Sequence, residues 1–145
     1  MAIVRAELRA GTAVSLHARH FHWSGDEPVR SGGTDLGPDP YEMLLGSLAT
    51  CIAVTLRFYA DHKEIPLAGV DVELEFDRVY GEDQSDFEHP SRSRIERIHS
   101  RVTIHGLLDD AQRARLAEIA ARCPVHKTLA NGVTFEDSAE FEPAE

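Results

Sequence analysis

The segment DPYEMLLGSLATCIAVTLRFYADH, residues 39–62, decides the fold of this chain. It opens with Asp39, a good helix cap, and with Pro40, which is favoured at the first helical position because no hydrogen bond needs its missing N–H. Apolar residues then recur around nearly the whole helix as far as His62. A helix that is apolar on nearly all sides is buried, so the sequence predicts a long central helix over residues 40–62.

The residues before this helix carry strand and turn patterns. Residues 2–9 and 13–23 are predicted as two strands around a turn at residues 10–12, because apolar and polar side chains alternate in the second of them. Residues 24–39 are rich in glycine, proline and aspartate and are predicted as a long loop. Ordered loops of this length are often functional or bridge subunits.

Two further strands are predicted after the central helix. Residues 70–80 alternate between apolar and mostly acidic side chains, and residues 94–105 repeat the alternation less strictly. Such a pattern is typical of antiparallel strands with one face on a core and the other in water. Residues 81–93 between them are polar and are predicted as a loop.

The last third of the chain is predicted to form a helix, a short helical turn and a final strand. Asp109 opens a helix with a capping arrangement, and Pro124 ends it. Residues 125–130 can add one short helical turn, and residues 133–136 are predicted as a last strand. This order of elements predicts one α+β domain over residues 1–145, with an antiparallel sheet around the central helix.

Charge and composition exclude several classes of protein. Fifteen Lys and Arg against twenty-five Asp and Glu give a formal charge of −10, which repels nucleic acid and anionic membrane surfaces. The first residues contain no apolar signal region, and the apolar run 43–56 is shorter than the roughly 20 residues of a membrane span. We therefore expect a cytoplasmic protein without nucleic-acid or membrane partners.

The two cysteines are the residues best suited to chemistry. Cys51 lies in the middle of the central helix, where a cysteine is more often a packing residue. Cys123 stands directly before Pro124, at the start of a new turn and close to His126 and Lys127. A helix N-terminus and a nearby cation both favour the reactive thiolate. The spacing of the two cysteines by itself is only a weak sign of a redox pair.

The sequences around these cysteines resemble those of the OsmC/Ohr family, the osmotically inducible protein C and organic hydroperoxide resistance proteins. The resemblance extends over about residues 14–136 and favours the OsmC-like subgroup. It is carried by two motifs. The first is Pro38-x-Pro40-Tyr41-Glu42-x-Leu44-Leu45-x-x-Leu48-x-x-Cys51, which continues through Thr55-Leu56-Arg57-x-Tyr59-Ala60, and the second is Arg122-Cys123-Pro124-Val125-His126-Lys127-Thr128-Leu129.

This resemblance implies an intertwined homodimer of α+β protomers with each active site at the subunit interface. It also implies that Cys51 is a peroxidatic nucleophile that reduces organic hydroperoxides, and that Cys123 is the resolving thiol that closes a disulfide. An external dithiol would then reduce this disulfide, in oxidative-stress defence. The resemblance implies neither a metal nor a prosthetic group.

The chain departs from the peroxidatic members that resemble it in the residues that activate the thiol. Those members have a glutamate ten residues before the nucleophile, where this chain has Tyr41. Glu42 faces about 180° away from the cysteine on a straight helix, so we assign it to the helix dipole or a loop contact. Candidates for an activating cation are Arg9, Arg19 and His126. The resemblance predicts an apolar pocket, with His22, Tyr41, Glu42, Leu48 and Phe58 as candidate lining residues.

Three histidines near the second predicted strand, His17, His20 and His22, do not make a metal site by pattern. Two histidines on one strand face are not a complete ligand set, so we expect structural roles for them. Two alternatives to the peroxidase remain open. One is a non-catalytic binding protein with an apolar pocket at the dimer interface, and the other is different sulfur chemistry, such as a persulfide carried on Cys51.

Overall fold

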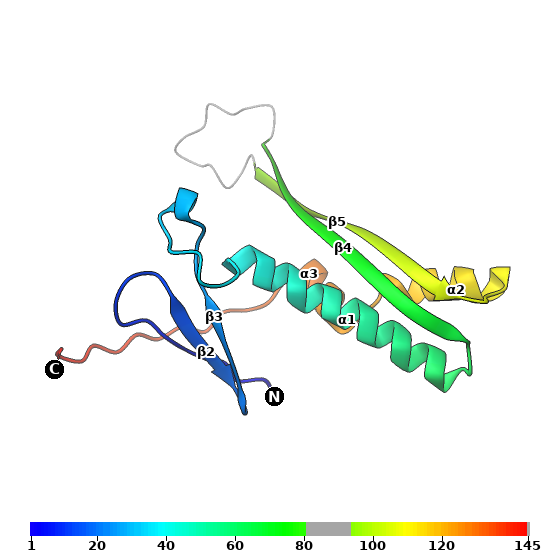
Figure 1. The fold of residues 1–145 in the computed structure, drawn as a ribbon, viewed down its shortest axis with the longest axis horizontal. Helices are drawn as coiled ribbons and strands as arrows, with labels where there is room; N and C mark the ends of the chain where they lie inside the picture. The colour runs from blue at the N-terminus through cyan, green and yellow to red at the C-terminus, as the bar shows by residue number, and fades with distance from the viewer. Residues whose placement is uncertain (81–93, 145) are drawn as a thin grey trace.

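The computed structural model describes residues 1–80 and 94–144 (Figure 1). It has the predicted α+β class, with antiparallel strand pairs and three α-helices. The predicted loop over residues 81–93 lies outside the described residues. The elements are β1 Arg5–Glu7, β2 Val14–Ala18, β3 Phe21–Gly25, a 3₁₀ turn η1 Val29–Ser31, α1 Pro40–His62, β4 Leu67–Tyr80, β5 Arg94–Gly106, α2 Asp110–Ala120 and α3 Pro124–Asn131.

Helix α1 has the bounds predicted from its capping signals. The Asp39 carboxylate accepts the Glu42 N–H at 2.8 Å, and the Glu42 carboxylate accepts the Asp39 N–H at 3.0 Å. Pro40 occupies the first turn. This reciprocal capping box satisfies two amides that would otherwise lack partners at the helix start. Glu42 therefore acts at the helix terminus.

The expectation that α1 is buried on nearly all sides is confirmed for one face only. Four residues spaced by one turn, Leu48, Ile52, Leu56 and Ala60, form a buried stripe. On other faces of the helix, Val54 is 41% exposed and Phe58 is 70% exposed. The prediction fails there because no other part of the single chain covers those side chains.

Helix α1 is also the one helix in residues 1–80 and 94–144 with the length and composition of a membrane span. Its most apolar window has a mean hydropathy of 1.6. The central helix of a soluble protein meets the same criterion, and α1 contributes its buried stripe to the core. The length and composition of α1 therefore do not distinguish a membrane span from a core helix.

Strands β4 and β5 form a long antiparallel hairpin that packs on α1. Their register runs from Leu67 opposite Gly106 to Tyr80 opposite Arg94, so β4 begins three residues before the predicted strand. Apolar side chains of both strands face the core. On the other side, Arg97 and Asp77 form an ion pair at 2.9 Å. The predicted division into a core face and a solvent face is confirmed.

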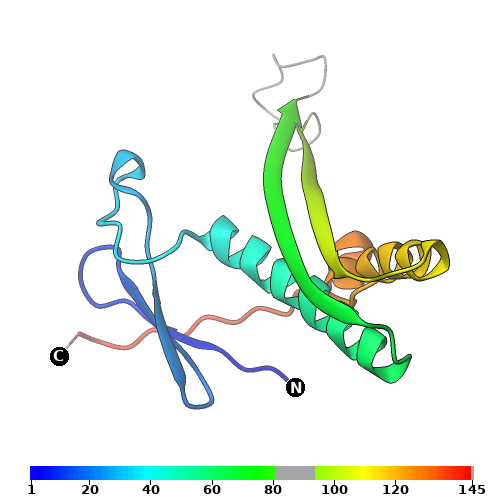
Figure 2. The ribbon, with the colours of Figure 1, turned by 45° about the vertical axis from the view of Figure 1, so that its right-hand side comes forward.

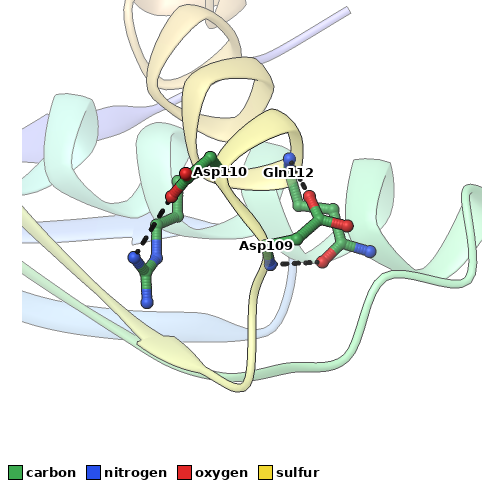
Figure 3. Close-up of polar contacts among 4 residues, drawn as sticks. Asp109, Asp110 and Gln112 are labelled. Atoms are coloured by element: carbon green, nitrogen blue, oxygen red, sulfur yellow. Dashed lines mark hydrogen bonds and ion pairs between the residues drawn. The ribbon is translucent and has the colours of Figure 1, made fainter.

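Helices α2 and α3 pack against α1. Asp109 and Gln112 form a second capping box at the start of α2, with reciprocal bonds of 2.8 and 3.0 Å (Figure 3). The predicted end of this helix at Pro124 is wrong, because α2 already ends at Ala120. Pro124 instead begins α3, where proline fits the first turn for the reason that applies at Pro40.

The N-terminal region forms a separate three-stranded sheet in the order β1-β2-β3. The single predicted strand over residues 13–23 is wrong: the chain reverses at Arg19, which has a positive φ of 54°, and Ala18 then pairs with Phe21. The first strand is also shorter than predicted. The predicted strand over residues 133–136 has no sheet partner, so it is not a strand in the single chain.

The two sheets lie apart in the single chain. Both views show the N-terminal sheet beside the start of α1, while the β4–β5 hairpin runs along the helix (Figures 1 and 2). The chain exposes 11592 Å² of surface, whereas a compact monomer of 16.1 kDa exposes about 7,400 Å². The single chain therefore leaves much more surface uncovered than a typical folded monomer.

The loop between β3 and α1 is organised by Asp26, a residue that is 4% exposed. It accepts hydrogen bonds from the hydroxyls of Thr12 and Thr34 and from the backbone N–H groups of residues 27, 34 and 36. The two hydroxyls and these amides hold the pKa of Asp26 well below its usual value, against the opposing effect of burial. Asp26 is therefore a charged hub of the loop.

We expect Asp26→Asn to lower the melting temperature at pH 7 and to flatten the loss of stability in acid. The pKa of Asp26 is lower in the folded chain than its ordinary 3.8, so its contribution is complete above that pH and is lost as the pH falls below it. Thermal unfolding followed by circular dichroism between pH 7 and pH 3 measures this. Asp35→Asn, in the same loop but exposed, is the matched control. If the melting temperatures of Asp26→Asn and Asp35→Asn changed with pH in the same way, the stabilising role of the Asp26 carboxylate would be contradicted.

Candidate functional site

The fold brings Cys51 and Cys123 to the first turn of one helix. The Val125 N–H donates to the Cys51 Sγ with an N···S distance of 3.5 Å. The next amide, that of His126, donates to the Cys123 Sγ at 3.4 Å. Two sulfurs separated by 72 positions in the sequence are thus bonded to adjacent amides of α3. Both cysteines are free thiols.

The local sequence explains why α3 presents these amides. Cys123 is the N-cap residue, with extended backbone angles, and Pro124 follows in the first turn without an N–H. The free amides at the helix start are therefore those of Val125 and His126, and no carbonyl of the helix can accept from them. The positive end of the helix dipole lies at the same place, and it favours a thiolate over a thiol.

The two cysteines differ in exposure. Cys123 is 0% exposed, whereas Cys51 is half-buried. Burial raises the pKa of the Cys123 thiol, and the neighbouring Cys51 acts in the same direction, while the amides of His126 and Val125 act against them. Cys123 is thus a protected thiol that keeps its proton, and Cys51 is the one that a solute can reach.

Thr55 is a further residue at the site, and sequence reasoning quoted it within the first motif but gave it no role there. Its Oγ1 lies 4.0 Å from the Cys51 Sγ, within the hydrogen-bonding range for sulfur. It stands four residues after Cys51 on α1, so the two side chains share one face of the helix. This spacing was the signal in the sequence that could have identified it.

A cavity with both apolar and polar lining residues adjoins α3 near its start. It has a volume of about 220 Å³ and lies between α1, β5 and α3. Leu48, one of the candidate pocket residues, lines it together with the exposed His126. His126 also donates its backbone N–H to the Cys123 sulfur, so this residue links the cavity to the cysteine site, although neither cysteine lines the cavity itself. The remaining lining residues are Glu96, Ile98, Ser100, Leu129 and Ala130.

The two arginine candidates lie in the N-terminal sheet region and make other contacts. The Arg9 guanidinium is 3.9 Å from the Glu7 carboxylate, and both are exposed. The Arg19 guanidinium lies over the ring of Phe21, 4.8 Å from its centre. Within one chain neither is brought to Cys51 by the contacts described, so an activating role for either stays a prediction.

The other pocket candidates occupy separate places. His22 lies on β3, and its ring centre is 5.7 Å from that of His17 on the neighbouring strand. The Tyr41 hydroxyl accepts a hydrogen bond from Arg78, whose guanidinium also lies over the Tyr41 ring. Phe58 projects outward about two turns beyond Cys51 on α1. Among the residues described, no group of three or more His, Cys, Asp or Glu is placed to hold a metal ion.

Comparison with known proteins gives a consistent result. A family model described as "OsmC-like protein" matches residues 32–137. Similar solved structures include an OsmC like protein from Mycoplasma pneumoniae, with 21% identity, coverage of 90% of this chain and 87% of the other, and a TM-score of 0.70. None of the curated proteins compared with the chain matches it.

Two further solved structures share the fold at low identity. An organic hydroperoxide resistance protein OsmC from Legionella pneumophila has 18% identity, coverage of 89% of this chain and 88% of the other, and a TM-score of 0.64. The organic hydroperoxide resistance protein OhrB of Bacillus subtilis has 22% identity, coverage of 88% and 89%, and a TM-score of 0.53.

We expect Cys123→Ser to keep α3 folded and Cys123→Ala to destabilise the chain. A serine hydroxyl can accept the His126 N–H as a cap, whereas alanine leaves this amide without its acceptor, at a cost of about 1 kcal/mol. Urea unfolding curves of the two variants measure the difference. Equal stability of both variants would show that the sulfur does not act as a cap.

Proposed function

The chain belongs to the OsmC-like protein family, and on that premise we propose that it reduces organic hydroperoxides with Cys51 and Cys123 as a reacting thiol pair. The observation that carries the proposal is the pair of hydrogen bonds from adjacent α3 amides to the two sulfurs. Hydrogen bonds from the N-terminus of a helix favour the thiolate form of a cysteine. Because the same helix start bonds the two sulfurs, it also holds Cys123 close to Cys51.

The roles of the two cysteines follow from their exposure. Cys51, the half-buried one, is the nucleophile, because a peroxide can reach it from outside. Cys123 is fully buried, and its pKa is raised by that burial, so it stays protonated and shielded from the peroxide. It reacts only when an oxidised sulfur forms beside it. This division gives a two-step reaction in a fixed order.

In the first step the Cys51 thiolate attacks the distal oxygen of the hydroperoxide and forms an S–O bond. The O–O bond breaks, and the leaving alkoxide takes up the proton that the thiol released, giving an alcohol. Cys51 is then a sulfenic acid, oxidised by two electrons, and the peroxide is reduced by two.

In the second step the Cys123 sulfur attacks the Cys51 sulfur. An S–S bond forms, the S–O bond breaks, and the hydroxyl leaves with the Cys123 proton as water. An external dithiol then reduces this disulfide by exchange and is itself oxidised. Within the chain the cycle needs no group other than the two thiols, and it suits the reducing cytoplasm that we propose as the location of the protein.

The nature of the substrate is supported by the cavity and by the relatives. Leu48, Ile98 and Leu129 give one part of the cavity an apolar wall that can hold an organic group, beside the polar residues Glu96, Ser100 and His126. Two of the proteins with the same fold are named organic hydroperoxide resistance proteins. The proposed role in oxidative-stress defence follows from this substrate class.

We also propose that two copies of the chain form the working unit. The single chain exposes 11592 Å², and apolar side chains such as Val54 and Phe58 remain uncovered on α1. The C-terminal segment 133–142 alternates between apolar and polar residues over much of its length but has no strand partner. A second copy could cover the helix, and its N-terminal sheet could bring Arg9 or Arg19 of the partner subunit to Cys51.

We expect one equivalent of cumene hydroperoxide to remove two hydrogens from the reduced protein. Rapid quenching, intact mass and peptide mapping should locate the change in a Cys51–Cys123 disulfide formed within seconds. Cys51→Ser should not react, because it removes the nucleophile. Cys123→Ser should stop at one added oxygen, which dimedone traps as a sulfenic acid.

Two free thiols that survive minutes of exposure to the peroxide would contradict the proposal. The cavity beside α3 would then support the binding-protein alternative instead. Full peroxidase activity in Cys51→Ser would overturn the assignment of roles, even if the wild-type protein reacts.

We expect the protein to sediment at twice its chain mass of 16.1 kDa, and Phe58→Asp to weaken this association. A charge on the uncovered face of α1 would have to be buried in the dimer, which is costly without a partner charge. Analytical ultracentrifugation over a range of concentrations measures the effect. Leu107→Asp, which changes an exposed residue of the β5–α2 loop, serves as the control. A monomeric wild-type protein would contradict the proposal.

A further inference from the structure

The α-helices of the described chain contain four serine and threonine hydroxyls, and one of them behaves differently from the others. Three donate to a backbone carbonyl on the preceding turn, at 2.7 to 3.1 Å. The fourth, that of Thr55, lies 4.0 Å from the Cys51 sulfur. The three carbonyl bonds run from Ser47 to Leu44, from Thr50 to Gly46 and from Thr128 to Pro124.

This difference reflects a choice between side-chain rotamers. A helical threonine has two accessible rotamers, and one of them lets its hydroxyl bond a carbonyl on the preceding turn. Thr50, one residue before Cys51, takes that bond. Thr55 directs its hydroxyl to the sulfur instead, although it is on the same helix. Both Thr55 and Cys51 are half-buried, so less water competes for this contact than at the exposed Thr50.

We propose that Thr55 is a positioning residue that stabilises the thiolate of Cys51. The inference rests on the proposed function, since it assigns a role at the same sulfur. In the thiol form either the S–H or the O–H can donate. Once Cys51 has lost its proton, only the Thr55 hydroxyl can donate, so deprotonation fixes the direction of the bond.

The thiolate would then have two donors from two different helices. One is the Thr55 hydroxyl on α1, and the other is the Val125 N–H on α3. Hydrogen bonds to a charged acceptor are shorter and stronger than bonds to a neutral one, so both contacts favour the charged form. Contacts of this kind are often long in the resting state and tighten when the charge develops. Thr55 thus supplies stabilisation without a formal positive charge.

The test measures the reactivity of Cys51 without any peroxide. In a Cys123→Ser background, which leaves a single thiol, the rate of alkylation by iodoacetamide is followed against pH. Thr55→Val removes the hydroxyl and nearly keeps the shape. We expect the midpoint of its pH profile to rise by about one unit, with alkylation about tenfold slower at pH values below the midpoint.

Matched variants separate this role from a structural one. Thr50→Val makes the same change on the same helix, where the hydroxyl bonds a carbonyl, and we expect its profile to stay at the parent midpoint. Thr55→Ser, which restores a hydroxyl, should return the midpoint to the parent value. Thr55→Ala provides a second hydroxyl-free variant if the valine does not fold.

Two outcomes would overturn the inference: a midpoint that Thr55→Val leaves unchanged, or equal shifts in Thr55→Val and Thr50→Val. The reaction with hydroperoxide is measured separately on proteins that keep both cysteines. A shifted alkylation profile without peroxide reduction would support the role of Thr55 and contradict the proposed function. Peroxide reduction together with an unshifted alkylation profile would support the proposed function and contradict the role of Thr55.

Discussion

The start of α3 has backbone amides that its own helix cannot satisfy, and two sulfur atoms accept two of them. Because Pro124 has no N–H, the amides of Val125 and His126 are the ones that need acceptors. One acceptor is local, the sulfur of Cys123, and the other comes from α1, the sulfur of Cys51. The contact between Val125 and Cys51 attaches α3 to the central helix, while the contact between His126 and Cys123 caps α3 itself. Together the two contacts hold both sulfurs at the start of α3, so the packing of this helix also builds the site.

The sequence predicts best those features that depend on neighbouring residues. The bounds of α1 follow from Asp39, Pro40 and Glu42, whose capping contacts lie within one turn. The β4–β5 hairpin follows from alternation that persists over many residues. Both patterns have a local physical cause, and both predictions are confirmed.

Three features could not be predicted from the sequence: the turn at Arg19, the boundary between α2 and α3, and the contact between Thr55 and Cys51. Their local sequence signals are weak, or they depend on contacts that the sequence does not specify. The turn at Arg19 contains neither glycine nor proline, so the alternation of residues 13–23 concealed it. Pro124 ends one helix or begins another with the same local chemistry, and α2 had already ended at Ala120. The bond between Thr55 and Cys51 depends on a rotamer, which sequence spacing permits but does not select.

Helix α1 has more apolar side chains than the rest of the single chain covers. The sequence pattern correctly indicates a helix whose side chains are mostly apolar. Within the single chain, only the stripe that contains Leu48 and Leu56 is buried. Burial of a helix is a property of everything packed around it, and a single sequence describes only its own contribution. The same reasoning applies to the two arginine candidates. Arg9 follows β1 and Arg19 lies in the turn between β2 and β3, and the N-terminal sheet stands apart from the β4–β5 hairpin in the single chain.

The loop hub at Asp26 has a consequence for the behaviour of the protein in salt. Its carboxylate is held by hydroxyls and amides, which carry no net charge. Mobile ions weaken attraction between separated exposed charges, such as the pair of Arg97 and Asp77, but they have little access to a buried carboxylate bonded at contact distance. The connection between β3 and α1 should therefore keep its form as ionic strength rises, while the ion pairs on the hairpin surface weaken.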